Sequence, residues 1–162
     1  MHRPPSAVSL RTEPYGSSGP QWVVDQAEAE LVTRYGGLDD GELGLAAAMF
    51  DPPSGAFLVV RVDGEPAPVG GVGVRTVAQG VGEVRRLWVD DPWRGHGIGR
   101  ALMTGLEDEA RSLGLSALIL ATGDRQPEAV ALYESSGWER PHVDAAGARL
   151  PPGYIRFSKV IA

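Results

Sequence analysis

The chain has 162 residues, a formal net charge of −6 and no cysteine. This length favours one domain that buries enough surface to fold without disulfides. The absence of cysteine excludes disulfide scaffolds, thiolate metal sites and a cysteine nucleophile. The acidic balance argues against a general nucleic-acid binder, because such proteins are usually basic.

The lengths of the apolar runs in the sequence predict the cellular location of the protein. Residues 1–6 lack the apolar run of a signal peptide, and we expect them to form a flexible tail before a single domain over residues 7–162. The apolar runs elsewhere are too short to span a bilayer. We therefore expect a cytoplasmic protein with no membrane partner.

Apolar alternation and turn residues predict a mixed α/β protein. The expected strands cover residues 8–12, 56–62, 69–77, 81–90, 117–121 and 154–161, and the expected helices cover residues 21–35, 42–50, 98–113 and 127–136. Residues 14–20 are rich in glycine, serine and proline, which predicts a loop. The strand over 117–121 consists of apolar residues alone, which predicts burial on both of its faces.

A glycine-rich segment, Arg-Gly-His-Gly-Ile-Gly at residues 94–99, joins an expected strand to an expected helix. The start of a helix leaves backbone N–H groups without partners, and glycines let such a backbone approach a phosphate closely. Arg94 and Arg100 can add charge-assisted contacts. The segment therefore favours an anion site, and the alternative is a plain connector without a ligand.

Two familiar nucleotide motifs do not fit this segment. The phosphate loop of many ATPases requires Gly-Lys-Ser or Gly-Lys-Thr, and the segment contains no lysine. The dinucleotide fingerprint requires a third glycine at the position of Arg100. A nucleotide-binding module is therefore disfavoured.

The surroundings of the segment resemble the GNAT N-acetyltransferase superfamily. Residues 83–102 are similar to its acetyl-coenzyme A motif, whose core Arg/Gln-x-x-Gly-x-Gly/Ala falls on Arg94, Gly97 and Gly99. Residues 126–138 are similar to a second family motif, which closes on Tyr-x-x-x-Gly-aromatic. The two motifs together resemble the small, single-domain bacterial members of the superfamily.

The resemblance implies a fold and a co-substrate. The implied fold is α/β, with a mixed and mostly antiparallel sheet of about six or seven strands, about four flanking helices and a splay between the fourth and fifth strands. Acetyl-coenzyme A is the implied acetyl donor, and no metal is implied. Leu87 and Val89 would bind it through backbone groups that a bulge leaves open, and Gln126 stands where many relatives carry asparagine. The residues implied to bind the donor are Leu87, Trp88, Val89, Arg94, Gly95, His96, Gly97, Ile98, Gly99, Arg100, Gln126 and Tyr133.

The implied reaction, direct acetyl transfer to an amine, requires a base and an acid. A free amine has a pKa of about 10 and is mostly protonated at neutral pH, so a base or a water relay must remove a proton. Glu83 begins the strand that leads to the glycine segment and is the candidate base. Its alternative role is a carboxylate paired with a neighbouring arginine. Tyr133 is the candidate acid, because a phenol stays protonated at neutral pH, and core packing is its alternative role.

The sequence says less about the amine acceptor than about the acetyl donor. Residues 1–80 contain 10 acidic against 5 basic residues, and residues 81–162 contain 11 against 10. The family forms its acceptor site largely in the first half, so this excess of acid favours a cationic amine of a small molecule or peptide. The candidate acceptor-binding residues are Tyr35, Asp39, Asp40 and Glu83. We expect a monomeric or homodimeric enzyme without a nucleic-acid partner, and the alternative is a catalytically silent acyl-coenzyme A sensor or regulatory module.

Overall fold

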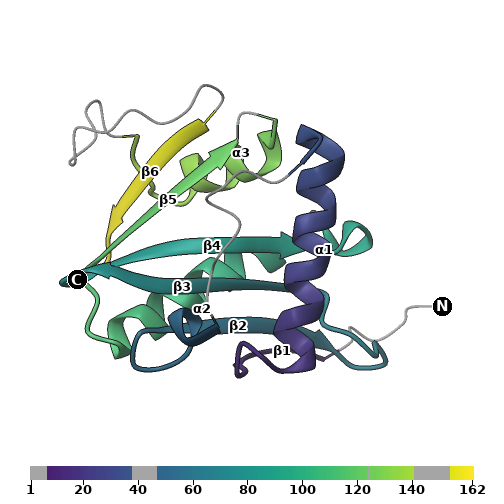
Figure 1. Ribbon diagram of the computed structural model, residues 1–162. Helices are drawn as coiled ribbons and strands as arrows, with labels where there is room; N and C mark the ends of the chain where they lie inside the picture. The colour runs from purple at the N-terminus through teal and green to yellow at the C-terminus, as the bar shows by residue number, and fades with distance from the viewer. Residues whose placement is uncertain (1–6, 38–46, 124, 141–153) are drawn as a thin grey trace.

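Six strands form one sheet in which spatial order follows chain order (Figure 1). The computed structural model describes residues 7–37, 47–123, 125–140 and 154–162. Neighbouring strands are antiparallel except for β4 and β5, which are parallel. The expected mixed and mostly antiparallel α/β fold is therefore confirmed. The strands are β1 (Val8–Thr12), β2 (Gly55–Val62), β3 (Gly70–Ala78), β4 (Val81–Val89), β5 (Ala117–Gly123) and β6 (Tyr154–Val160).

Helices cover both faces of the sheet. Helix α1 crosses one face, and α2 lies behind the opposite face (Figure 1). Helix α3 follows β5 and packs on the same side as α2. In the described residues the helices are α1 (Ser18–Tyr35), α2 (Ile98–Ser112) and α3 (Pro127–Ser135), together with two 3-10 turns, η1 (Ala47–Phe50) and η2 (Asp91–Trp93).

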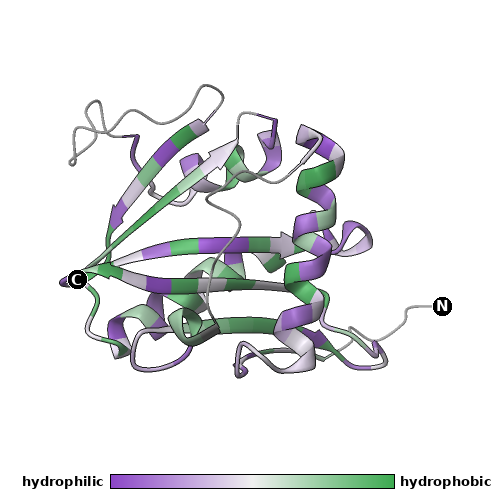
Figure 2. Ribbon diagram, in the orientation of Figure 1, coloured by the Kyte–Doolittle hydropathy of each residue, from purple (hydrophilic) through white to green (hydrophobic). Residues whose placement is uncertain are grey.

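Each face of the sheet has its own hydrophobic core. The core toward α2 and α3 contains the fully buried Leu102, Leu106 and Phe157. The core toward α1 contains Phe50 and Phe57, which pack edge to face with ring centroids 6.4 Å apart. Strand β2 is apolar along nearly its whole length and buried on both faces (Figure 2). The cores hold β2, β3 and β4 as a fixed platform for the outer strands.

Two predictions about the helices are wrong in part. Helix α1 begins at Ser18, inside the expected loop over 14–20. Pro20 lies in its first turn, where a proline removes no helical hydrogen bond because that N–H would have no partner anyway. The expected helix over 42–50 is described only as the 3-10 turn η1, and residues 42–46 lie outside the described part of the chain.

The prediction that the fifth strand is buried on both faces is wrong. Leu118 and Leu120 are buried on the face toward α2, but Ala121 on the other face is exposed. Helix α1 packs chiefly on β2, β3 and β4, so the outer face of β5 has less cover. This opening at β5 borders the pocket described below.

Strands β4 and β5 part soon after they meet. Their pairing consists of three residue pairs and ends at Glu83 opposite Ile119. Beyond that point β4 continues to Val89 beside β3, and β5 continues to Gly123 beside β6. The expected splay between the fourth and fifth strands is therefore confirmed, and no strand of the described residues pairs with the last part of β4 on its β5 side.

A β-bulge lies just past the last β4–β5 pair. Gly73 pairs with Arg85 and Gly71 with Trp88, so two residues of β4 oppose one residue of β3. Arg86, one of those two, has φ of 62°, which a non-glycine residue seldom adopts. A bulge of this kind bends a strand and shifts its alternation by one residue. Leu87 consequently packs on the α2 side, and Arg86 pairs with Glu28 of α1 at 3.0 Å.

Gly73 provides the first test of this packing. A Cβ there would lie 2.8 Å from ring carbons of Phe50 and Phe57. Gly73→Ala is expected to lower the free energy of unfolding by about 1–3 kcal/mol, because an overpacked core must shift. Gly16→Ala is the control, since a Cβ there meets nothing within 4 Å. Urea unfolding measures both variants, and equal stability of Gly73→Ala and the unsubstituted protein would contradict the packing.

Candidate active site

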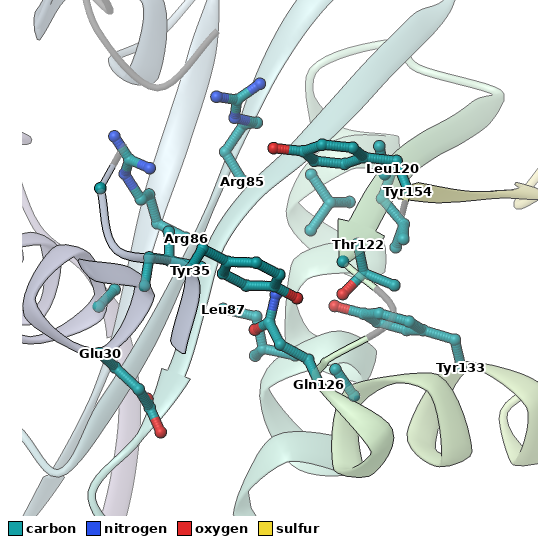
Figure 3. A pocket seen from close by; sticks show the side chains of 17 residues that line it. Glu30, Tyr35, Arg85, Arg86, Leu87, Leu120, Thr122, Gln126, Tyr133 and Tyr154 are labelled. Atoms are coloured by element: carbon teal, nitrogen blue, oxygen red, sulfur yellow. The ribbon is translucent and has the colours of Figure 1, made fainter. Parts of the chain in front are cut away.

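A pocket opens where β4 and β5 part (Figure 3). Its wall comes from α1, β4, β5, α3 and β6, so segments from both halves of the chain meet there. One part of the lining is rich in hydroxyl and amide groups, and another part is cationic. The polar and charged lining residues are Glu30, Tyr35, Arg85, Arg86, Thr122, Gln126, Tyr133 and Tyr154.

Two buried hydroxyl groups belong to the lining. Thr122 at the end of β5 is 6% exposed, and Tyr133 of α3 is 5% exposed. Figure 3 shows their hydroxyl oxygens turned toward one another in the pocket. Tyr133 is held by Trp138 and Phe157, whose ring centroids lie 5.8 and 5.5 Å from its own. Burial raises the pKa of the Tyr133 phenol well above its ordinary value, so the phenol keeps its proton.

The glycine segment forms the start of α2. Gly97 is the N-cap residue with φ of 81°, and Gly95 has φ of 78°. No side chain caps this helix, so its first-turn N–H groups point outward as an anion site requires. Gly99 lies within the helix, where a Cβ would come within 3.3 Å of Leu132, and its glycine lets α3 pack closely. Ile98 is buried beneath the segment.

The arginines of the segment bind protein groups. Arg94 donates from Nε to the Val89 carbonyl at 2.8 Å and from Nη2 to both carboxylate oxygens of Glu30 at 2.8 and 2.9 Å. Arg100 donates to the hydroxyls of Ser135 and Ser136 on α3. The Val89 carbonyl, one of the backbone groups that we expected to be open, therefore already has a donor.

Of the residues expected to bind the donor, Trp88, Val89 and residues 94–100 lie outside the pocket lining. Trp88 is buried in the core toward α1 because the bulge turns it to that face. His96 is exposed, and its ring nitrogen Nδ1 lies 2.9 Å from the Arg94 carbonyl oxygen. Leu87, Gln126 and Tyr133 do line the pocket.

Glu83 lies beside the pocket and does not line it. Its Oε1 accepts hydrogen bonds from Arg75 Nε and Arg85 Nη1, each at 3.1 Å. Arg85 itself lines the pocket. The structure therefore gives Glu83 the arginine pairing that the sequence left as its alternative role, and any contact with a bound molecule must extend past Arg85.

The C-terminal half of α1 is joined to both sides of the splay. Glu30 binds Arg94 on the β4 side, and Arg34 binds both Glu30 at 3.0 Å and Glu128 of α3 at 2.5 Å. Tyr35 accepts a hydrogen bond from the Arg125 N–H at 3.1 Å. The helix thus forms a polar bridge across the pocket. Burial raises the pKa of the Glu128 carboxyl, but the Arg34 hydrogen bond and the charges of Arg34 and Arg94 outweigh it and hold the pKa below its ordinary value.

Of the expected acceptor-binding residues, Tyr35 lines the pocket, and its hydroxyl lies so close to Gly123 that any Cβ there would collide with it. Asp39 and Asp40 lie outside the described residues. The sequence did not point to five of the polar lining residues: Glu30, Arg85, Arg86, Thr122 and Tyr154. A signal for Thr122 was present, because it is the polar residue that continues the buried alternation of Leu118 and Leu120 along β5.

Within residues 7–37, 47–123, 125–140 and 154–162, no three histidine, aspartate or glutamate side chains lie close enough together to hold a metal ion. No helix in the same ranges is long and apolar enough to cross a membrane.

The sequence of this chain is similar to the sequences of known acetyltransferases. Residues 20–138 match the acetyltransferase (GNAT) family. An IAA acetyltransferase of Azospirillum brasilense is 44% identical over 86 residues, which are 53% of this chain and 56% of that protein. A mycothiol acetyltransferase of Thermobispora bispora is 34% identical over 147 residues, which are 86% of this chain and 49% of that protein. The chain spans about half the length of these relatives.

Solved structures share the fold. An acetyltransferase of the GNAT family from Staphylococcus aureus superposes with a TM-score of 0.76 at 13% identity, covering 96% of this chain and 100% of that one. A GNAT family acetyltransferase from Elizabethkingia anophelis, solved with acetyl-CoA bound, superposes with a TM-score of 0.64 at 15% identity, covering 94% and 97%. These two superpositions show that the chain shares its overall fold with both acetyltransferases. The present chain belongs to the GNAT acetyltransferase family, as its family match shows.

The ion pair between Arg34 of α1 and Glu128 of α3 is expected to make the stability of the fold depend on pH. The lowered pKa means that the Glu128 carboxylate is bound more favourably in the folded chain than in the unfolded one. Glu128→Gln is therefore expected to lower Tm at neutral pH, where the carboxylate is ionised. As the pH falls through the folded pKa the carboxylate takes up a proton, and the difference from the unsubstituted protein should vanish.

Thermal unfolding from neutral to acidic pH measures this difference. Glu109→Gln on helix α2, away from the pocket, is the matched control and should show little change in Tm. A deficit of Glu128→Gln that stays constant as the pH falls well below the ordinary glutamate value of 4.5 would contradict the ion pair.

Proposed function

We propose that this protein transfers an acyl group from acyl-coenzyme A to a primary amine of a small molecule or peptide. The acyl group that we propose is acetyl. The observation that carries the proposal is the pocket between the parted ends of β4 and β5, which has the hydroxyls of Thr122 and Tyr133 in its wall and whose lining residue Glu30 binds Arg94 of the glycine segment. Membership of the GNAT family supports the same reaction class.

The residues present fit an acyl-coenzyme A molecule. The first-turn N–H groups that follow Gly97 suit its phosphate groups, and Arg100 adds positive charge beside them. In the part of the chain that the structure describes, no strand pairs with β4 around Leu87 on its β5 side, which suits an extended ligand with amide groups. Gln126 and Tyr133 line the pocket from α3 and suit the thioester end.

The chain supplies proton transfer and orientation. When bound, acyl-coenzyme A supplies a thioester whose C–S bond breaks as the amine forms the new C–N bond, with the electron pair staying on sulfur. Tyr133 keeps its phenolic proton in the pocket and donates a hydrogen bond to the sulfur as negative charge develops there. Glu83 accepts the proton that the amine loses, through water, because its carboxylate lies beside the pocket.

Charged side chains of the pocket can orient the proposed amine acceptor. Glu30 is the acidic residue of the described lining, and Arg85 and Arg86 are its basic residues. We propose that Tyr35 and Glu83 act on the acceptor side, together with Asp39 and Asp40. The names of the relatives, IAA acetyltransferase and mycothiol acetyltransferase, favour a small-molecule acceptor over a protein surface.

One observation favours the second candidate, an acyl-coenzyme A-binding module without turnover. Glu83 is bound by two arginines, which restricts it as a base. A panel of primary amines with acetyl-coenzyme A separates the two candidates through release of free thiol. The enzyme is expected to release thiol with at least one amine. A protein whose Tm rises with coenzyme A but that releases no thiol with any amine would be the sensor.

The glycine at the start of α2 tests donor binding. Gly97→Val is expected to weaken coenzyme A binding at least about tenfold, because a β-branched residue resists positive φ and covers the N–H groups. Gly114→Val is the matched control, since Gly114 at the other end of α2 has φ of 82° and equally open surroundings. Both variants should lose similar stability. Coenzyme A should still raise Tm in Gly114→Val, and equal binding by both variants would contradict the donor site.

Glu83 tests the base. Glu83→Gln is expected to lower kcat/KM at neutral pH by about 10²–10⁴-fold, the usual contribution of a general base. The deficit should shrink above about pH 9, where more of the amine arrives neutral. A pH–rate series for both proteins on one acceptor measures this, with Glu65→Gln in an exposed turn as the control.

A loss that is the same at every pH would instead assign Glu83 to holding Arg85 or the acceptor. Full activity of Glu83→Gln would leave it as a surface ion pair.

A further inference from the structure

Thr122 is a buried polar residue that no step of the reaction above uses. It is 6% exposed, and Arg86 is the other polar residue in the buried set of the described chain. Its hydroxyl makes no hydrogen bond to any of the described residues, and the same holds for the hydroxyl of Tyr133. Both hydroxyls face the pocket and neither is a fully buried atom of the core, so both are available to a molecule bound in the pocket.

The position of Thr122 places its hydroxyl where β4 and β5 have parted. It lies on β5 beyond Ile119, the last residue paired with β4, and it lines the pocket. Along the strand it follows Leu118 and Leu120 on the face toward α3, where an apolar side chain would complete the core. Its hydroxyl oxygen and that of Tyr133 face the same part of the pocket from β5 and α3 (Figure 3). One ligand atom between them would receive two hydrogen bonds.

We propose that Thr122 and Tyr133 together bind the sulfur of coenzyme A, with Thr122 as a second hydrogen-bond donor to the thiolate that leaves during transfer. The inference rests on the proposed function, because that reaction places a thiolate in this pocket. The hydroxyls of Thr122 and Tyr133 are both donors, and hydrogen bonds to an ionised acceptor are stronger than those to a neutral one. Two donors therefore stabilise the thiolate more than the thioester sulfur, which favours the transition state over the bound substrate.

Stability of the ligand-free protein gives the first readout. Thr122→Val keeps the shape of the side chain and removes the hydroxyl. Because the hydroxyl has no described partner, this variant is expected to be at least as stable as the unsubstituted protein in thermal unfolding. A clear loss of Tm would show that the hydroxyl has a structural hydrogen bond and would overturn the proposal.

Binding of coenzyme A and of desulfo-coenzyme A gives the second readout, which needs no acceptor. Calorimetry at alkaline pH, where a fraction of the free thiol is ionised, compares the two ligands in each protein. The unsubstituted protein is expected to prefer coenzyme A. Thr122→Val is expected to lose about ten- to a hundred-fold of that preference, as for one hydrogen bond to a charged group. Thr122→Ser, which keeps a hydroxyl, should retain most of it.

Each result of these binding measurements either supports or overturns the contact between Thr122 and the sulfur. Equal preference in Thr122→Val and the unsubstituted protein, or equal loss for both ligands, would overturn the sulfur contact. No preference in the unsubstituted protein would overturn it as well. Where an amine acceptor is turned over, Thr122→Val should lower kcat with little change in the affinity for acetyl-coenzyme A. If the sulfur contact is found and no amine is acetylated, the inference about Thr122 stands and the proposed transferase activity fails.

Discussion

The early parting of β4 and β5 is the constraint on which the rest of the structure depends. Two parallel strands that stayed paired to their ends would close this edge of the sheet with backbone hydrogen bonds. Here the pairing ends at Glu83, and a bulge at Arg86 turns β4 away. The positive φ of Arg86 is strained, and the hydrophobic cores on both faces together with the Glu28 ion pair hold it in place. The pocket, its open strand edge and its two buried hydroxyls all follow from that separation.

Helix α1 closes one side of the pocket, and ion pairs hold the helix in place there. Exposed ion pairs are individually weak, about 0–1 kcal/mol each, but Glu30, Arg34, Arg94 and Glu128 form a connected set that joins α1 to the strand on one side and to α3 on the other. Arg94 belongs to the family motif at the start of α2, yet its described contacts are with Glu30, Asp91 and the Val89 carbonyl. Its guanidinium thus ties the helix that covers the pocket to the segment that we propose binds phosphate.

The sequence predicted the strands, the glycine segment and the family, because these depend on local alternation, turn residues and short motifs. It could not predict the partner of Arg94, since that pairing depends on the tertiary fold: Glu30 and Arg94 are 64 residues apart in the chain. The arginine pairing of Glu83 was one of the two roles that the sequence left open, because Arg85 is only two residues away. The start of α1 was missed because proline is compatible with both a loop and a first helical turn. Thr122 was missed because a single polar residue that ends an apolar strand is ordinary until the fold shows it buried against α3. Asp39 and Asp40 stay predictions.

The central claim is that acyl-coenzyme A lies along the open edge of β4 and reaches the start of α2. Amide hydrogen exchange with and without coenzyme A tests it most directly. Bound coenzyme A is expected to slow exchange in peptides covering residues 84–100 and the end of β5, with little change in β1 and β2, and NAD is expected to have no such effect. Protection confined to other parts of the chain, or no protection at a concentration of coenzyme A that raises Tm, would show that coenzyme A does not lie along β4.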